Sequence, residues 1–254
     1  MSKILDTIIE NKKNEIKKAK RELPFEYLIN NSKVGNRSFY KALKGKNNII
    51  AEIKFKSPSS GFFTKRSIIE IASIYDRHAN AISVLTDKKF FGGKLENIMK
   101  VKEQSSLPVL RKDFILEPYQ VCESRFYGAD AILLIAGVLN EEELRAMLSF
   151  AHRLGMDCLV ETRTETDVKK ALSAGAKIIG INNRNLSSNN FEVNLETTKN
   201  LKKLIPSDKI VVSESGIFTR TDIEEVNCNA VLIGTSLMNA DDIEKKLRLL
   251  KTEA

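Results

Sequence analysis

The segments Ala131-Ile132-Leu133-Leu134-Ile135, Glu141–Arg153 and Cys158-Leu159-Val160, in that order, decide the fold class of this 254-residue chain. The first and last are short and uniformly apolar, which is typical of parallel strands buried on both faces. The middle segment carries apolar residues such as Leu144 and Leu148 at helical spacing. The sequence therefore predicts a strand–helix–strand unit.

The same alternation continues through most of the chain. Eight apolar runs predict strands at Asn48–Ile53, Ala81–Leu85, Pro108–Leu110, Ala131–Ile135, Cys158–Val160, Ile178–Ile181, Ile210–Val212 and Val231–Ile233. Eight strand–helix units form either a closed barrel or a large doubly wound sheet. Because no Gly-x-Gly-x-x-Gly motif follows the first run, the dinucleotide-binding sheet is disfavoured. We predict an α/β fold, a (β/α)8 TIM barrel.

The first part of the chain lies outside this alternation. Its pattern predicts a helix over Lys3–Glu22, a break at Pro24 and a shorter helix over Phe39–Lys44. We therefore expect a single domain, in which residues 1–46 form an N-terminal helical extension and residues 47–254 the barrel. The extension would cover the bottom of the barrel or lie over its mouth.

Composition excludes several classes of protein. The chain has no apolar run of transmembrane length and no secretory signal, so we expect a cytoplasmic protein that does not enter a membrane. Three widely spaced cysteines, Cys122, Cys158 and Cys228, are expected to be reduced thiols in or near the core. The sequence leaves the oligomeric state open, with a monomer as the working expectation.

The net charge of +8 raises the question of nucleic-acid binding. Part of the excess lies on the first predicted helix, at Lys12, Lys13, Lys17, Lys18, Lys20 and Arg21. No RNP-like aromatic motif, zinc finger or basic-zipper heptad accompanies these residues, so we expect no nucleic-acid partner. The pattern instead favours a solvated basic face that raises the local concentration of an anionic small molecule.

Polar residues follow the predicted strands at one end, where barrel enzymes place their chemistry. Charges beside apolar strands are costly to bury unless they are paired or used, which marks the following as candidates: Glu52, Lys54, Lys112, Glu161, Arg184 and Glu214. The polar Asn182 ends a predicted strand at the same end and is a further candidate. Glu52 and Lys54 lie two residues apart on one strand, so both should point into the barrel. The two histidines, His78 and His152, fall on outer helices, so acid–base catalysis would depend on lysine and glutamate.

Two short glycine-containing turns follow the last two strands. Ser215-Gly216 and Gly234-Thr235 occupy the loops at which many barrels bind phosphate through backbone N–H groups. The sequence therefore predicts a phosphorylated small-molecule substrate.

Seven motifs together resemble the indole-3-glycerol-phosphate synthase family. They are Ala51–Lys54 with Ser57-Pro58-Ser59, Ser83–Asp87 with Phe90–Gly93, Leu110–Phe114, Tyr119–Arg125 leading into Gly128–Ile135, Leu159–Glu161, Gly180–Leu186, and Ser213–Ile217. The resemblance covers nearly the whole chain. It implies a step of tryptophan biosynthesis, in which 1-(2-carboxyphenylamino)-1-deoxyribulose 5-phosphate loses carbon dioxide and water without a cofactor or metal.

The resemblance also implies roles for individual residues. Lys112 would be the general acid, Glu161 and Glu52 would assist proton transfers, and Lys54 would face the anthranilate carboxylate and share the acid role. Asn182 and Arg184 would hold the substrate and orient the carboxylates, and Glu214 would be a further substrate-binding residue. The remaining binding residues would be Ser57, Ser215, Gly216, Gly234 and Thr235 for the phosphate, and Phe91, Phe114, Ile135 and Leu186 for the aromatic ring.

Two departures from the family and three alternatives remain. The loop Gly61–Ile68 lacks an Asp-Pro pair, and Arg77–Ala81 lacks a Gly-Ala pair, which places loop dynamics in doubt more than chemistry. A related barrel, phosphoribosylanthranilate isomerase, would need a cysteine and an aspartate at strand ends, but the first strand offers Glu52 and Lys54 and no cysteine. A non-catalytic phosphate binder would not need Lys112, Glu161 and Glu52 together, and a nucleic-acid binder rests on the net charge alone.

Overall fold

Eight parallel strands form a closed barrel in the computed structural model, which describes residues 3–32, 35, 37–57, 61–62, 66–185 and 192–251. Around the barrel the strands follow the order β1-β10-β9-β8-β7-β6-β5-β4. Their bounds are β1 (Asn48–Ile53), β4 (Ala81–Leu85), β5 (Val109–Lys112), β6 (Ala131–Ile135), β7 (Asp157–Thr162), β8 (Ile178–Asn182), β9 (Ile210–Glu214) and β10 (Ala230–Ile233). A short antiparallel pair, β2 (Lys56–Ser57) and β3 (Gly61–Phe62), lies outside the barrel.

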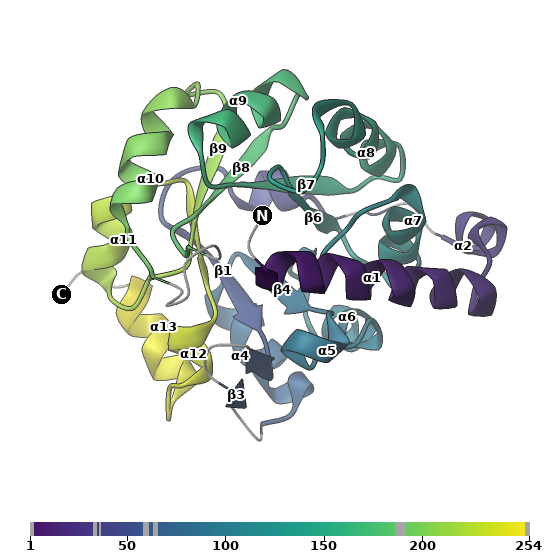
Figure 1. Ribbon diagram of the computed structural model, residues 1–254. Coiled ribbons are helices and arrows are strands. Elements are labelled where there is room, and N and C mark those ends of the chain that lie inside the picture. Colours follow the sequence, from purple (N-terminus) through teal and green to yellow (C-terminus); the bar gives the residue numbers. More distant parts are fainter. Residues whose placement is uncertain are drawn as a thin grey trace.

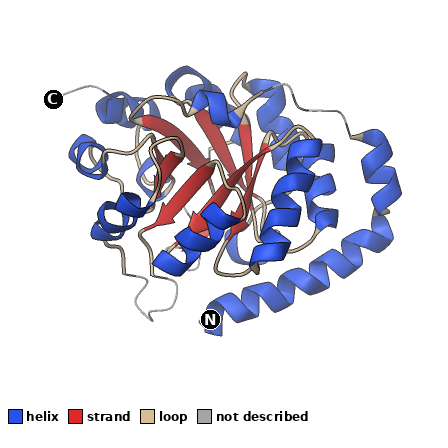
Figure 2. Ribbon diagram, turned by 90° about the horizontal axis from the view of Figure 1, so that it is seen from above, coloured by secondary structure: helices blue, strands red, loops and turns tan. Residues whose placement is uncertain are grey.

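Helices surround the strands, as Figure 2 shows, so the predicted (β/α)8 barrel is confirmed. They are α4 (Ile68–His78), α5 (Lys88–Phe91), α6 (Glu96–Gln104), α7 (Pro118–Phe126), α8 (Glu141–Arg153), α9 (Glu165–Ser173), α10 (Glu196–Leu201), α11 (Arg220–Val226), α12 (Thr235–Met238) and α13 (Ile243–Lys251), with a 3-10 turn at Lys202–Leu204. Helices α8 and α9 begin with capping boxes at Asn140 and Thr164. In each, the cap side chain accepts a backbone N–H of the first turn, and the side chain of the third helical residue accepts the backbone N–H of the cap residue.

Several strands continue beyond the apolar runs into charged residues. The pairing of β4 with β5 extends to Leu85 and Lys112, and that of β8 with β9 extends to Asn182 and Glu214. Side chains alternate along each strand, so Leu110 and Lys112 face the barrel interior while Val109 packs against the helices. The predicted strand ends at Leu110 and Val212 were therefore too early, because apolar character stops before backbone pairing does.

In its described residues the N-terminal extension has three helices, α1 (Lys3–Glu22), α2 (Phe25–Asn31) and α3 (Phe39–Ala42). The first was predicted with the same bounds, the second was not predicted, and the third ends before the expected Lys44. Two fully buried side chains, Phe39 and Leu43, join the interior cluster at the first residues of the strands. Tyr40 donates its backbone N–H to the Asp157 carboxylate at 2.8 Å. This part of the extension closes the bottom of the barrel.

Helix α1 reaches the opposite end of the barrel. Figure 1 shows it running from the centre of the ring of strands outward to α2. Leu5 lines the cavity at the carboxyl ends of the strands, so the extension covers both the bottom and part of the mouth. The predicted solvated face is wrong for Lys12, which is only 4% exposed, while Lys13, Lys17 and Lys18 face solvent.

Two predictions from composition can be compared with the described residues. No helix in these ranges combines the length and the apolar character needed to cross a membrane. Cys122, Cys158 and Cys228 are buried free thiols, as expected. Burial raises the pKa of Cys122 and Cys228 to about 11, so both are protonated at neutral pH and are poor nucleophiles.

Candidate active site

A cavity opens at the carboxyl ends of the barrel strands, where the sequence placed the chemistry. Every predicted site residue whose side chain is described lines it: Glu52, Lys54, Phe91, Lys112, Phe114, Ile135, Glu161, Asn182, Arg184, Glu214, Ser215, Gly216, Gly234 and Thr235. The Ser57 side chain and Leu186 lie outside the described residues. Leu5 and Phe218 also line the cavity and were not predicted.

The Lys112 ammonium lies at the centre of three carboxylates from different strands. Its Nζ is 3.5 Å from Glu214, 3.8 Å from Glu52 and 3.8 Å from Glu161. Burial alone would lower the pKa of Lys112, but the three carboxylates outweigh burial and raise it above its ordinary value. Lys112 is therefore protonated at neutral pH and able to donate a proton.

Glu214 has the most perturbed carboxyl group of this cluster. Burial, reinforced by Glu161 and Glu52, raises the pKa of Glu214 to about 8 even though Lys112 opposes the rise. Apart from the Lys112 ammonium, neither carboxylate oxygen has a hydrogen-bonding partner among the described residues. Sequence reasoning gave Glu214 no distinct role. Its raised pKa depends partly on neighbours from β1 and β7, and their proximity cannot be read from the sequence around Glu214.

Glu52 connects the two lysines of the cavity. Its carboxylate lies 3.3 Å from Lys54 Nζ and 3.8 Å from Lys112 Nζ. Lys54 also donates a hydrogen bond to Thr235 Oγ1 at 2.9 Å. Glu52 and Lys54 thus share the interior side of the barrel as their spacing predicted, and Thr235 contacts a lysine in addition to lining the cavity.

Two glycines provide the space in which the carboxylates lie. A Cβ atom on Gly180 would be 2.1 Å from Glu214 Oε1, and one on Gly234 would be 2.2 Å from Glu52 Oε1. Any side chain at either position would displace the neighbouring carboxylate. The sequence had suggested Gly234 as a phosphate contact, and the structure adds this steric requirement.

The apolar wall of the cavity comes from separate elements. Phe91 ends α5 and Phe114 follows β5, and their rings lie 6.3 Å apart at an angle of 37°. Ile135 ends β6 directly beside Glu161 of β7. Leu5 of α1 adds a further apolar side chain to the cavity lining, and Phe218 lines the cavity from the loop after β9. An aryl ring held here would lie next to the Lys112 cluster.

Polar contacts order the turns that follow β8 and β9. The Asn182 side-chain oxygen accepts the Ser215 hydroxyl at 3.0 Å and the Arg184 backbone N–H at 3.0 Å. Ser215 and Gly216 both have positive φ, 68° and 84°, so the chain turns sharply there. Asn183, which sequence reasoning missed, donates to Ser213 Oγ and to the Ser215 carbonyl. The sequence feature that could have indicated Asn183 is the pair Asn182-Asn183 at the end of a predicted strand.

Other candidate chemistries have less support in the described residues. His78 and His152 lie on the outer helices α4 and α8, as predicted, and neither lines the cavity. None of the three cysteines lines it either, which weighs against the isomerase alternative. No group of three or more His, Cys, Asp or Glu side chains in the described ranges has the arrangement of a metal site.

A closed (β/α)8 barrel with a lysine–carboxylate cluster at its mouth defines the class of barrel enzymes that use acid–base catalysis. A family model described as indole-3-glycerol phosphate synthase matches residues 5–250. The chain therefore belongs to the indole-3-glycerol phosphate synthase family. This confirms the family and the activity predicted from the sequence.

Individual relatives agree over nearly their full length. An indole-3-glycerol phosphate synthase of Dehalococcoides mccartyi is 45% identical over 259 residues, which cover 97% of this chain and 99% of that protein. One from Caldanaerobacter subterraneus subsp. tengcongensis is 46% identical, with 94% of each chain covered. A solved 3-hexulose-6-phosphate synthase from Salmonella typhimurium shares the fold, with a TM-score of 0.64 and 14% identity over 80% of this chain and 96% of that chain.

Proposed function

We propose that this chain is a carboxy-lyase that closes the indole ring of 1-(2-carboxyphenylamino)-1-deoxyribulose 5-phosphate with loss of carbon dioxide and water. The observation that carries the proposal is the protonated Lys112 among Glu52, Glu161 and Glu214, beside an apolar wall. A lysine that donates a proton to the substrate carbonyl, with fixed carboxylates that stabilise a developing cation, matches what ring closure requires.

Lys112 is the proposed general acid on the carbonyl oxygen while the aryl carbon attacks the carbonyl carbon. Loss of carbon dioxide then restores the aromatic ring, and loss of the hydroxyl as water completes the indole. Glu161 and Glu52 assist the proton transfers, and Lys54 faces the substrate carboxylate. The wall of Phe91 and Phe114 holds the aryl ring against the carbonyl carbon, which supplies the orientation that the reaction needs.

The phosphate is proposed to bind on the opposite side of the cavity, at the turns after β9 and β10. Ser215 and Gly216 turn their backbone there with positive φ, and Gly234 and Thr235 begin α12. Ser57 and Leu186 remain predictions for the phosphate and the aryl ring. A cytoplasmic location, a monomeric state and the independence from a metal also remain predictions from the sequence.

Turnover is tested by incubating the purified protein with the carboxyphenylamino-deoxyribulose phosphate in excess EDTA. We expect indole fluorescence to rise at a rate that EDTA leaves unchanged, because acid–base groups of the chain carry the chemistry. The chain contains no tryptophan, so its own fluorescence does not mask the product. Binding of the substrate without any rise would support the non-catalytic alternative instead.

The raised pKa of Glu214 predicts a pH-dependent cost in stability. When the pKa of a carboxyl group is higher in the folded than in the unfolded state, the group contributes to the unfolding free energy at low pH. This contribution is lost as the pH rises through the folded-state pKa. The unfolding free energy of the parent relative to Glu214→Gln should therefore fall by roughly a few kcal/mol between pH 4.5 and about 8. Denaturant titrations across this range measure the difference, and a constant difference would refute the raised pKa.

A further inference from the structure

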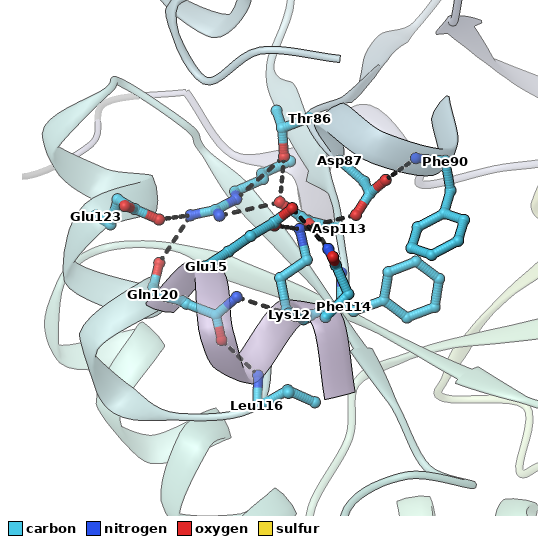
Figure 3. Close-up of polar contacts among 12 residues, drawn as sticks. Lys12, Glu15, Thr86, Asp87, Phe90, Asp113, Phe114, Leu116, Gln120 and Glu123 are labelled. Atoms are coloured by element: carbon cyan, nitrogen blue, oxygen red, sulfur yellow. Dashed lines mark hydrogen bonds and ion pairs between the residues drawn. The ribbon is translucent and has the colours of Figure 1, made fainter. Parts of the chain in front are cut away.

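One lysine of helix α1 is buried among acidic groups next to the candidate active site. Lys12 Nζ lies 2.9 Å from Asp87 Oδ2, 2.9 Å from Asp113 Oδ1 and 2.8 Å from Glu15 (Figure 3). Asp87 and Asp113 are 0% and 4% exposed, so they depend on Lys12 and their other partners for compensation of their charge. This ammonium joins α1 to two segments that are far apart in the sequence.

Each of the two aspartates fixes the backbone of a segment that carries one of the cavity phenylalanines. Asp87 is the N-cap of α5 and accepts the Phe90 N–H at 2.8 Å, and α5 ends at Phe91. Asp113 lies between Lys112 and Phe114 in the sequence and accepts the Phe114 N–H at 2.8 Å. The position of Lys12 therefore affects both rings and the residue next to the proposed acid.

The second carboxylate oxygen of Asp113 has its own partners, which fix the position of this side chain. Its Oδ2 accepts the Thr86 hydroxyl at 2.6 Å and the Arg111 guanidinium at 3.0 Å. Arg111 is in turn paired with Glu123 of α7 at 2.8 Å. Figure 3 shows Lys12 completing this network from the side of α1. Because the network is buried and mutually bonded, loss of one member shifts the others.

Lys12 acts from outside the catalytic cavity. It lines the neighbouring groove between α1 and α6, while Asp113 lines both that groove and the cavity. Leu5, which does line the cavity, precedes Lys12 by seven residues and so lies on the same face of α1. Lys12 thus fixes the helix that supplies part of the apolar wall without contacting a bound substrate.

We propose that Lys12 is a positioning residue, which holds Phe91, Phe114 and Leu5 in the arrangement that orients the aryl ring over Lys112. The proposal rests on the proposed function of these residues. The phosphate turns after β9 and β10 are supplied by other elements. Loss of Lys12 should therefore lower the rate of ring closure far more than it weakens substrate binding.

The test compares Lys12→Met with a matched variant, Lys102→Met. Lys102 pairs with the fully buried Asp130 at 2.6 Å, just before β6 and thus at the amino-terminal end of the barrel. Both substitutions leave a buried aspartate without its ammonium, but only Lys12→Met does so beside the cavity. Lys18→Met, on the exposed face of α1, controls for loss of charge from the helix.

We expect Lys12→Met to lower kcat by about 10- to 100-fold with KM changed by less than about threefold, because misplaced reacting groups cost rate. Lys102→Met should lower the melting temperature comparably yet keep kcat near that of the parent when assayed well below that temperature. Lys18→Met should change neither quantity. Asp87→Asn keeps the N-cap acceptor but weakens the link to Lys12, so it should lower kcat in the same selective way by a smaller factor.

A kcat of Lys12→Met no lower than that of Lys102→Met would overturn the positioning role and leave only a structural one. Should Lys12→Met fail to fold, the same comparison between Asp87→Asn and Lys102→Met decides the question. Turnover by the parent in the same assay tests the proposed function separately. Failure of the positioning role would therefore leave the proposed function intact.

Discussion

Replacing Lys112 by methionine should lower kcat by about 10²–10⁴-fold, the range that a positioned general acid contributes. Methionine has similar length but cannot donate a proton, so the carbonyl oxygen would lose its acid during ring closure. The cluster lines a cavity that opens at the mouth of the barrel, and methionine keeps the apolar stem of the lysine, so we expect the fold to survive. The fluorescence assay measures the loss.

Binding and stability distinguish this loss from a general defect. The variant should bind indole-3-glycerol phosphate with an affinity close to that of the parent, because the proposed phosphate turns lie on β9 and β10. Lys199→Met provides a control, since Lys199 pairs with Glu196 and Glu225 on the outer helices α10 and α11. A kcat of Lys112→Met within tenfold of the parent would refute the acid role.

Replacing Glu52 by glutamine should lower kcat by about 10²–10³-fold. Glu52 lies within 4 Å of both Lys54 and Lys112, so its negative charge orients both ammonium groups and can stabilise a cation in the cavity. Glutamine keeps the shape that fits against Gly234 but removes the charge and the proton acceptor. The effect should appear mainly in kcat, measured with saturating substrate.

A matched control for this variant is Glu244→Gln on α13. Glu244 also contacts two cationic side chains, Arg77 at 2.9 Å and Arg248 at 2.7 Å, but it lies on the outside of the barrel. Equal kcat values for Glu52→Gln and the parent would show that the charge between the two lysines has no part in the reaction. A loss in both variants would point to a general electrostatic effect.

The sequence predicts the barrel well because apolar runs and helical spacing are local signals. All eight strands begin within one residue of the predicted starts, and α8 has the predicted bounds. The ends of strands are harder to predict, since β5 continues through Arg111 and Lys112, whose charges are compensated by distant residues. Helix α2 was missed because Phe25, Tyr27 and Ile29 are exposed, so its pattern is not that of a helix buried on one face.

The candidate site was predictable as a set of residue types but not as an arrangement. Charges at one end of the strands gave Glu52, Lys112 and Glu161, and alternation placed Glu52 and Lys54 inside the barrel. The raised pKa of Glu214 depends on burial and on Glu161 and Glu52 of other strands, which no local pattern contains.

Lys12 was assigned to solvent because it lies in a run of lysines. The sequence also contained a signal for burial of Lys12, because apolar residues, Ile8 and Ile16, lie four positions before and after it on the same face of the helix. Both are buried in the structure. Lys12 thus lies within the apolar stripe of α1. Its partners, Asp87 and Asp113, are too distant in the sequence for the pairing to be predicted from local pattern.

The closure of the barrel bottom by Phe39 and Leu43 has a consequence for synthesis of the chain on the ribosome. Residues 38–43 emerge early, but their hydrogen-bond acceptor Asp157 on β7 and the last members of the same interior cluster, Ala230 and Leu232 on β10, appear much later. Until then the interior cluster around these apolar side chains is incomplete, and such transient exposure favours aggregation. Translation must therefore nearly finish before this early segment can reach its final place.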